Sequence, residues 1–430
     1  MSDQPAGVSD RMRADWNQRA REDARYYVAF GARGQDEEDF AATAADVLRS
    51  LEHELKRLPR DTDHRARRAL EIGCGPGRLM KPLSRHFGEI HGVDVSDEMV
   101  GFARESLRDI PHAHVHATNG ASLSQFASAS FDFVYSYAVF QHIPSREVVL
   151  EYMRETLRVL KPGGVFRGQF NGLPHSATPD TWAGVTFSAD DIRAFTREQG
   201  IPLMSLEGVQ TQYMWTTWRK RPLPHPAPEP LPLAIHRITN AYSGEFVAPN
   251  RGQFASLAIW VEHLPDEADL NNLEVAVDGV PGTVVYVGPS DGKQQVNVRL
   301  PPGVRTGLVP VDLRWNGKPL AAPALVRLIP SGPLTPRIVS VSDGVNLSQK
   351  NRSVTGSLKV QIEEISSPET VRAAVGGLAV EKLDIVCIDP IPPRYEINVS
   401  MPAGLSSGTH LLEIWAGSRR LLPSEIYIAP

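Results

Sequence analysis

The chain has 430 residues, 41% of them hydrophobic and 22% charged, with a formal net charge of −5; one compact core does not normally hold so many residues, so we expect two or three domains. The charge is divided almost evenly between the two halves of the chain, which argues against nucleic-acid binding by a basic surface. The sequence has no apolar run long enough for a membrane span, no signal-peptide core at its N-terminus and only two cysteines, so we expect a cytoplasmic protein without disulfide bonds or membrane spans.

Residues 1–60 are expected to form a helical segment ahead of the first domain. Apolar side chains recur with a helical period over residues 38–57. Upstream, Trp16, Tyr26 and Tyr27 lie in a stretch rich in charged residues. We expect this stretch to form a lid over a ligand pocket, because such a lid would exclude water; the alternative is a helix that packs its aromatic side chains on the domain core.

Residues 61–220 alternate between strand-like and helix-like patterns. Such alternation predicts an α/β Rossmann-like domain with a mainly parallel sheet, covered on both faces by helices. The strand candidates are residues 69–73, 91–95, 113–117, 131–137 and 165–170.

Residues 221–232 have a proline at every second position from Pro222 to Pro232. Proline lacks the N–H group that a β-ladder needs and favours an extended backbone. We therefore predict a semi-rigid linker between domains.

After this linker the helical period disappears, and short β-rich runs alternate with glycine, proline and aspartate. The segment 296–307 matches the segment 397–408, and each copy is followed by a strand that carries a tryptophan, Trp315 or Trp415, and then by a glycine. This pattern predicts two tandem antiparallel β-sandwiches, at 233–331 and 332–430. They resemble immunoglobulin-like modules of the IPT/TIG type.

The strand at 69–73 leads into a loop with glycines at 73, 75 and 77. Glycines at such a turn let the backbone approach a ligand closely. The dinucleotide pattern G-x-G-x-x-G is not met, because position 78 is Arg. The pattern E-x-G-x-G-x-G, beginning at Glu71, instead resembles the first motif of class I S-adenosylmethionine-dependent methyltransferases, and the order of later motifs extends the resemblance over residues 65–219.

The resemblance implies a mainly parallel seven-stranded sheet, with S-adenosylmethionine as cofactor and S-adenosylhomocysteine as product. Asp94 follows Gly73 at the end of the next strand, where a carboxylate can accept both ribose hydroxyls. Met99 is expected against the adenine face, and Asn119 at the adenine amino group, unless Asn119 only forms an Asn-Gly turn. The residues predicted to bind the cofactor are Glu71, Gly73, Cys74, Gly75, Gly77, Arg78, Asp94, Val95, Met99, Asn119, Gly120, Ser136 and Tyr26.

His142, after the fourth strand, is the candidate general base, and the alternative is that it only orders its loop. Related quinone-biosynthesis O-methyltransferases carry acidic residues beside the matching histidine and bind a divalent metal there. Here the neighbours are Phe140 and Gln141, so we expect no metal. The residues predicted to contact the methyl acceptor are Trp16, Tyr27, Tyr137, Phe140, Gln141, Phe170, Asn171 and Trp182, whereas the cluster of Tyr213, Met214, Trp215 and Trp218 is expected in the sheet core.

The resemblance to class I methyltransferases implies methyl transfer by in-line displacement. Together with the residues predicted around the pocket, it leads us to expect a small-molecule acceptor that is methylated on oxygen or nitrogen without a metal. Two alternatives remain open. In one, the sandwiches bind a peptide or protein acceptor along a strand edge; in the other, the chain is a non-catalytic S-adenosylmethionine-binding scaffold. Because residues 233–430 contain no cluster of acid, base and nucleophile, we expect the sandwiches to serve assembly into a homo-oligomer or positioning.

Overall fold

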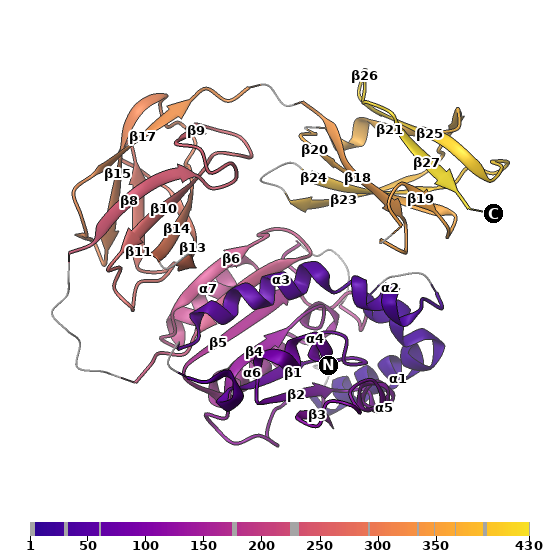
Figure 1. The fold of residues 1–430 in the computed structure, drawn as a ribbon, viewed down its shortest axis with the longest axis horizontal. Helices are drawn as coiled ribbons and strands as arrows, with labels where there is room; N and C mark the ends of the chain where they lie inside the picture. Colours follow the sequence, from indigo (N-terminus) through magenta and orange to yellow (C-terminus); the bar gives the residue numbers. More distant parts are fainter. Residues whose placement is uncertain are drawn as a thin grey trace.

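The computed structural model describes residues 5–29, 33–59, 62–173, 179–223, 232–290, 293–332, 335–347, 349–365, 367–389 and 394–429. Figure 1 shows one α/β lobe and two β lobes, with the second β lobe lying over the helices that precede the first strand of the α/β lobe. Within the described ranges, no helix is both long and apolar enough to cross a membrane. Residues 224–231, which hold most of the predicted proline-rich linker, are outside the described residues.

The α/β domain is built on a sheet in the strand order β3-β2-β1-β4-β5-β7-β6. Strands β1 to β5 run parallel, and β7 runs antiparallel to both of its neighbours. The mainly parallel seven-stranded sheet predicted from the sequence is therefore confirmed. The strands are β1 (Arg68–Ile72), β2 (Glu89–Asp94), β3 (Ala113–Ala117), β4 (Phe131–Ser136), β5 (Leu160–Phe170), β6 (Leu203–Glu207) and β7 (Met214–Arg219).

Helices cover the sheet and precede it, as Figure 1 shows. Several begin at a side-chain cap; Ser96, for example, accepts a hydrogen bond from the Met99 backbone N–H and starts α5. The helix after the glycine loop is a single turn that begins only at Met80, late enough to accommodate Pro82 in its first turn. The helices are α1 (Pro5–Ala29), α2 (Glu37–Ala42), α3 (Ala45–Glu54), α4 (Met80–Leu83), α5 (Asp97–Ser106), α6 (Arg146–Val159) and α7 (Ala189–Glu198).

The N-terminal segment is helical but interrupted twice. The helix expected over residues 38–57 is divided into α2 and α3 at Thr43, whose hydroxyl donates to the Phe40 carbonyl at 2.6 Å; such local bonding competes with a continuous helix. Helix α1 is kinked at Asp23, which is extended (φ −173°). The Asp23 carboxylate accepts the backbone N–H groups of Tyr26 and Gly34, so it caps the last turns of α1 and holds the loop that follows.

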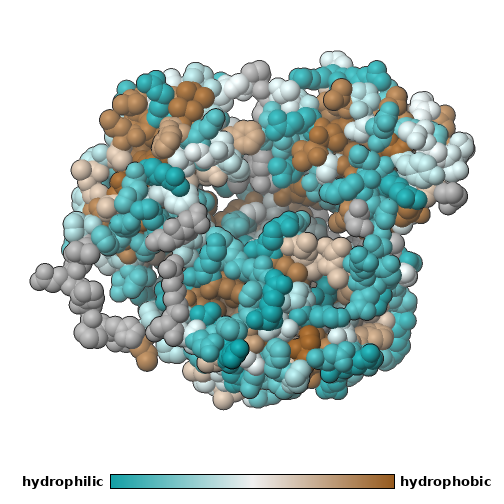
Figure 2. Space-filling model, viewed as in Figure 1, coloured by the Kyte–Doolittle hydropathy of each residue, from teal (hydrophilic) through white to brown (hydrophobic). Residues whose placement is uncertain are grey.

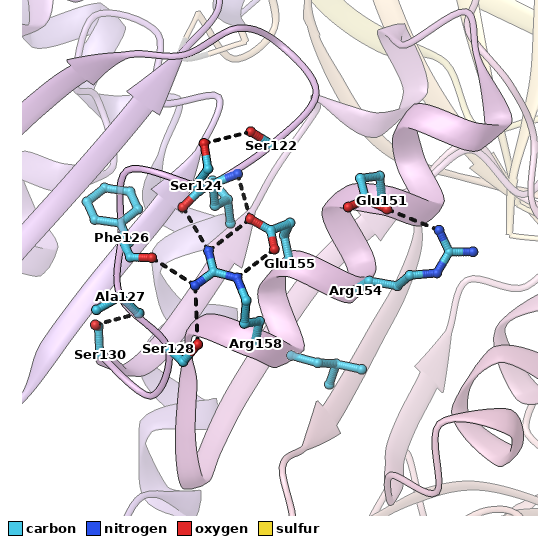
Figure 3. Close-up of polar contacts among 12 residues, drawn as sticks. Ser122, Ser124, Phe126, Ala127, Ser128, Ser130, Glu151, Arg154, Glu155 and Arg158 are labelled. Atoms are coloured by element: carbon cyan, nitrogen blue, oxygen red, sulfur yellow. Dashed lines mark hydrogen bonds and ion pairs between the residues drawn. The ribbon is translucent and has the colours of Figure 1, made fainter.

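Arg158 on α6 fixes the loop between β3 and β4 (Figure 3). Its guanidinium pairs with Glu155, one turn earlier, and donates to the carbonyls of Phe126 and Leu123 at 2.8 and 3.0 Å. Glu155 also accepts the backbone N–H of Leu123. The planar guanidinium of Arg158 thus satisfies two backbone carbonyl groups of a loop that is not paired in a β-sheet.

The C-terminal half forms two β-sandwiches with the same strand order. In the first, β8-β10-β14-β13 faces β12-β11-β15-β17-β9, and in the second β18-β20-β24-β23 faces β22-β21-β25-β27-β19. The repeated segments begin in β14 and β24, and Trp315 and Trp415 lie on β15 and β25. The internal repeat therefore corresponds to a duplicated module.

The strands of the first sandwich are β8 (Ala234–Asn240), β9 (Val247–Pro249), β10 (Ser256–Glu262), β11 (Leu273–Val277), β12 (Val280–Pro281), β13 (Thr283–Ser290), β14 (Lys293–Arg299), β15 (Gly307–Trp315), β16 (Lys318–Pro319) and β17 (Ala324–Ile329). Those of the second are β18 (Arg337–Asp343), β19 (Arg352–Ser353), β20 (Ser357–Glu363), β21 (Val371–Val375), β22 (Leu378–Ala379), β23 (Leu383–Asp389), β24 (Arg394–Ser400), β25 (Gly408–Ala416), β26 (Arg419–Arg420) and β27 (Ser424–Ile428).

The first sandwich is joined to the α/β domain through the sheet itself. Strand β13 pairs antiparallel with β6 at Tyr286 and Ser205, so the sheet continues to eleven strands. The apolar side chains of the two parts form one buried cluster, whereas the second sandwich has a core of its own. The backbone of Leu203 bonds Leu270 and the Asp269 carboxylate across this junction. The first sandwich is therefore an extension of the α/β domain, despite the linker between them in the sequence.

Candidate active site

A cavity of about 530 Å³ opens at the carboxyl ends of β1, β2 and β4. Ligands of open α/β sheets bind at this edge, where the loops that follow the strands leave a crevice. The wall includes the glycine loop after β1, the end of β2, the loop after β4 and part of α1. The second sandwich closes it from outside with residues of β20, β23 and β24.

The glycine loop adopts a backbone that other residues would adopt only with strain. Gly73, Gly75 and Gly77 have φ angles of +71°, +50° and +83°. A Cβ atom on Gly73 would lie 2.2 Å from the Val139 side chain, well inside van der Waals contact. The loop is also held to β2, because the backbone N–H groups of Gly73 and Cys74 both donate to the Val93 carbonyl. The glycines therefore let the loop lie directly against the cavity wall.

Two buried carboxylates face this cavity, Glu71 at the end of β1 and Asp94 at the end of β2. Burial raises the pKa of Glu71 to about 8, against a hydrogen bond of 2.9 Å from the Tyr135 hydroxyl. Burial also raises the pKa of Asp94 to about 6, although its oxygens accept the backbone N–H groups of Gly75 and Ser96. Desolvation disfavours the charged form of both acids, so the cavity suits a ligand that carries positive charge or hydroxyl donors.

Arg78 supplies a buried positive charge beside these acids. It is 9% exposed, and its Nη1 donates to the Thr43 hydroxyl at 2.8 Å. Its Nε atom is buried without a hydrogen-bond partner among the described residues. Burial lowers the pKa of Arg78, and a buried cationic donor of this kind can bind an anion that enters the cavity. With two acids and one base, the cavity has the charge pattern expected for a zwitterionic ligand with hydroxyl groups.

Helix α1 covers one side of the cavity with aromatic side chains. Trp16 lies edge-on to His142 at 5.4 Å, and Tyr27 lies edge-on to Trp182 at 6.1 Å. Arg19 lies over the rings of both tryptophans and donates to the Thr181 carbonyl at 3.0 Å. The helix is thereby tied to the loop at 179–187, and together they shield the cavity.

His142 is buried at the base of this aromatic wall. Its Nδ1 lies 2.7 Å from the Trp182 carbonyl, which can only accept, so Nδ1 carries the proton. Its Nε2 lies 3.2 Å from the Gln141 amide nitrogen. Burial lowers the pKa of His142 to about 4, so the ring is neutral at pH 7. Both ring nitrogens therefore have protein partners.

Gln169 organises the loop after β4, which carries His142, and the sequence did not suggest this role. Its side chain is fully buried; the oxygen accepts the Ala138 N–H at 2.9 Å and the nitrogen donates to Gln141 Oε1 at 2.9 Å. Ala138 has a φ of +56°, an uncommon conformation for a residue with a Cβ atom. The bonds from Gln169 explain how this strained turn is held at the cavity wall.

Many of the predicted residues do line the cavity. For the cofactor these are Glu71, Gly73, Cys74, Gly75, Arg78, Asp94, Val95 and Met99, and for the acceptor and its chemistry Trp16, Tyr27, Tyr137, Gln141, His142 and Trp182.

The structure places other predicted residues outside the cavity wall, for local reasons. Asn119 is exposed, and its Oδ1 accepts the N–H groups of Ala121 and Ser122, so the turn alternative describes its side chain. Phe140 and Phe170 pack on each other at 5.0 Å in the core. The remaining residues off the wall are Gly77 (against Leu107), Gly120 (against Val95), Ser136 (bonded to the Ile72 carbonyl), Asn171 (bonded to the Leu173 N–H) and Tyr26 (under Arg33).

Several residues of the cavity wall could not be predicted from the sequence pattern. Tyr213, expected in the core, is 41% exposed and lines the cavity, while Met214 and Trp218 are buried as expected. The others include Met12, Val28, Thr118, Tyr152, Gln212 and a set from the second sandwich: Leu347, Lys359, Asp384, Val386, Ile388, Glu396 and Asn398. In the described part of the chain, no group of three or more histidine, cysteine, aspartate or glutamate side chains is arranged to hold a metal ion.

Comparison with known proteins agrees with this geometry. Residues 70–167 match the family described as "Methyltransferase domain". The chain is 35% identical over 97 residues to phosphoethanolamine N-methyltransferase 2 of Caenorhabditis elegans, covering 22% of each chain. It is 31% identical over 159 residues to trans-aconitate 2-methyltransferase of Rhodopseudomonas palustris, covering 36% of this chain and 50% of the relative.

Among solved structures, the chain is similar to phosphoethanolamine N-methyltransferase 1 of Haemonchus contortus in complex with phosphoethanolamine and S-adenosylhomocysteine. The TM-score is 0.40 at 16% identity, over 51% of this chain and 50% of that one. The chain thus spans half or less of the length of the curated relatives named above.

Proposed function

From the class I methyltransferase domain that this chain contains, we propose that the protein transfers a methyl group from S-adenosylmethionine to an oxygen or nitrogen atom of a small-molecule acceptor. The observation that carries this proposal is the cavity in which two buried acids, the glycine loop and Arg78 adjoin a wall of aromatic side chains. The two curated relatives are named for small acceptors, phosphoethanolamine and trans-aconitate, which favours a small molecule over a peptide.

The inner half of the cavity would hold the cofactor. Asp94 would accept ribose hydroxyls, and Arg78 would bind the carboxylate of the amino-acid part through its unpaired Nε. Glu71 would lie near the cofactor's positive charge, which would favour its ionised form over the protonated form that burial favours in the free protein, and Val95 and Met99 would contact the adenine ring. When bound, the cofactor supplies an electrophilic methyl group on a sulfonium.

The outer half would position the acceptor and exclude water. Holding two reacting groups in line removes about 7–11 kcal/mol of the barrier in well-oriented reactions. Trp16, Tyr27 and Trp182, which line the cavity, would hold an apolar acceptor in that line, and α1 would act as the lid.

His142 would position this wall and would not remove a proton. It is neutral at pH 7, its Nδ1 is bonded to the Trp182 carbonyl and its Nε2 faces Gln141. A group with a pKa of about 4 is a weak base at neutral pH. The acceptor would therefore lose its proton to solvent, or it would bind in a form that is already deprotonated.

The first test is calorimetric titration of the full chain with S-adenosylhomocysteine and, separately, with NAD. Binding of S-adenosylhomocysteine alone is expected, whereas binding of NAD would overturn the assignment of the cofactor.

The second test incubates the protein with [methyl-³H]S-adenosylmethionine and a cell extract, then separates small molecules from protein. Label in the small-molecule fraction is expected, and label confined to protein would favour a peptide acceptor.

A further inference from the structure

The outer wall of the cavity comes from the second β-sandwich, a module far from the glycine loop in the sequence. Lys359 lies on β20, Asp384, Val386 and Ile388 on β23, and Glu396 and Asn398 on β24, and all six line the cavity that contains Asp94 and Glu71. The sandwich therefore faces the reaction site and is not confined to a remote surface.

The strand register places these residues on one face of the sheet. Lys359 is paired with Asn398, and Asn398 with Asp384, so the three form one row across β20, β24 and β23. In the next row, Glu396 is paired with Val386. Side chains alternate along a strand, and the intervening residues, such as Val360 and Ile397, are fully buried in the sandwich core.

The outward face of β23 also carries apolar side chains. Val386 and Ile388 point away from the sandwich core, yet both are only partly exposed. Strands that are apolar on both faces are typical of sheets covered on both faces. Here the cover is the methyltransferase domain, and the hydrogen bond from Asn346 Nδ2 to Asp39 Oδ2 (3.1 Å) joins the two parts beside α2.

The two copies of the module are used differently. In the first sandwich, β13 extends the methyltransferase sheet through β6. The equivalent strand in the second sandwich, β23, is an edge strand whose only described ladder partner is β24, and its side chains face the cavity. Figure 1 shows the second sandwich above α2 and α3, and Figure 2 shows a hollow between the upper lobes and the lower one.

The charges on this face indicate what it would bind. Lys359 and Glu396 form an ion pair of 3.0 Å and largely neutralise each other. Asp384 accepts one hydrogen bond, from Asn398 at 3.2 Å, and is exposed. Among the described residues of this face that line the cavity, Asp384 is therefore the carboxylate without an ion pair, and it lies beside the apolar Val386 and Ile388.

We propose that this face of the second sandwich selects the methyl acceptor by contacting the end of the acceptor that is remote from the methyl group. It would favour a cationic group, or one rich in hydroxyl or amine donors, and disfavour an anionic one. The inference rests on the proposed function, because it takes the cavity to hold the cofactor and acceptor together.

The position of this face, next to the remote end of the acceptor, can be tested without knowing the acceptor. The probe is an S-adenosylhomocysteine analogue with nitrogen in place of sulfur, carrying a flexible alkyl chain that ends in a diazirine. After irradiation of the full chain, mass spectrometry is expected to find label on peptides from β23 or β24, which excess S-adenosylhomocysteine abolishes. Competable label confined to the methyltransferase domain would overturn the inference while supporting the proposed function, and an absence of competable label would overturn both.

The charge preference is tested with two related analogues, whose chains end in an ammonium or a carboxylate group. Calorimetry on the full chain is expected to show tighter binding of the ammonium analogue. Asp384→Asn should reduce the ratio of the two affinities by about two- to fivefold, as expected for a partly exposed ion pair. Glu425→Gln, which removes an exposed carboxylate from β27 of the other sheet, should leave the ratio unchanged. Equal affinities in the unmodified protein would refute the charge preference.

Discussion

Asp94→Asn is the substitution that separates cofactor binding from folding most sharply. Asp94 is 9% exposed, and its two oxygens accept backbone N–H groups at 2.8 and 2.9 Å. The rise of its pKa from 3.8 to about 6 corresponds to about 3 kcal/mol against ionisation. Asparagine removes that cost but weakens two hydrogen bonds, each worth about 1 kcal/mol. We therefore expect the free energy of unfolding of the unliganded protein to change by less than about 2 kcal/mol.

Binding should respond far more strongly. Each hydrogen bond from a ribose hydroxyl to the carboxylate is worth about 1.5–3 kcal/mol, so losing the charged acceptor should weaken S-adenosylhomocysteine binding by about a hundredfold or more. The pH dependence has a definite sign. Because the pKa of Asp94 in the free protein is about 6, affinity should fall as the pH is lowered through 6, and the variant should lack that step.

Stability has the opposite pH dependence. The folded carboxyl keeps its proton up to about pH 6, whereas the unfolded one loses it near pH 4, so the contribution of Asp94 to stability decreases as the pH rises between these values. Calorimetry at several pH values and thermal unfolding measure both effects. The control is Asp97→Asn, on the first turn of α5 with a side chain 57% exposed. An unchanged affinity in Asp94→Asn would refute the placement of the ribose.

Further predictions follow from the same geometry. Gly73→Ala should abolish binding of S-adenosylhomocysteine and lower the melting temperature, because its Cβ atom would meet Val139 at 2.2 Å; normal binding in a titration would contradict the described loop. His142→Gln should reduce the methylation rate modestly and leave its pH profile above pH 5 unchanged, whereas loss of an acidic limb, the fall in rate at low pH caused by protonation of a base, would identify His142 as a general base. Arg158→Ala should lower the free energy of unfolding by about 1–3 kcal/mol, measured with urea, because it leaves loop carbonyls unpaired; the exposed Arg154 on the same helix, changed to Ala, is the control. The fragment 1–221 should aggregate, because it exposes β6 and the core shared with the first sandwich, and a soluble monomer by light scattering would show that the junction is dispensable.

Because the first sandwich shares a core with the α/β domain, truncation cannot isolate the role of the second sandwich. Truncation after Arg221 would remove the second sandwich together with part of the methyltransferase core, because Arg193 donates to the Leu270 carbonyl and Arg57 to the Val287 carbonyl across the junction. Loss of activity in that fragment would not distinguish folding from acceptor binding. Point substitutions on β23 and β24 keep the shared core intact and address acceptor binding alone.

Local sequence was sufficient to predict the inner wall of the cavity, which we propose binds the cofactor. The glycine loop, Glu71 and Asp94 lie at the ends of adjacent strands, and the backbone conformation that they need is set by a few consecutive residues. The duplicated sandwiches could likewise be predicted, because the repeat and the alternation along each strand are written in consecutive residues. The role of Asn119 could not be predicted in this way, because an Asn-Gly pair is compatible with both a turn and a ligand contact.

The outer wall of the cavity depended on tertiary structure. The sequence does not encode in any single segment that β13 pairs with β6, that Tyr213 leaves the core, or that β23 turns Asp384 and Val386 toward the cavity. These features arise when surfaces from distant parts of the chain pack together, and the pattern along one strand shows only that a face is apolar or polar. Consecutive residues are therefore enough to predict the fold class and the glycine loop, whereas the packing of the second sandwich on the methyltransferase domain sets which side chains form the outer wall of the cavity.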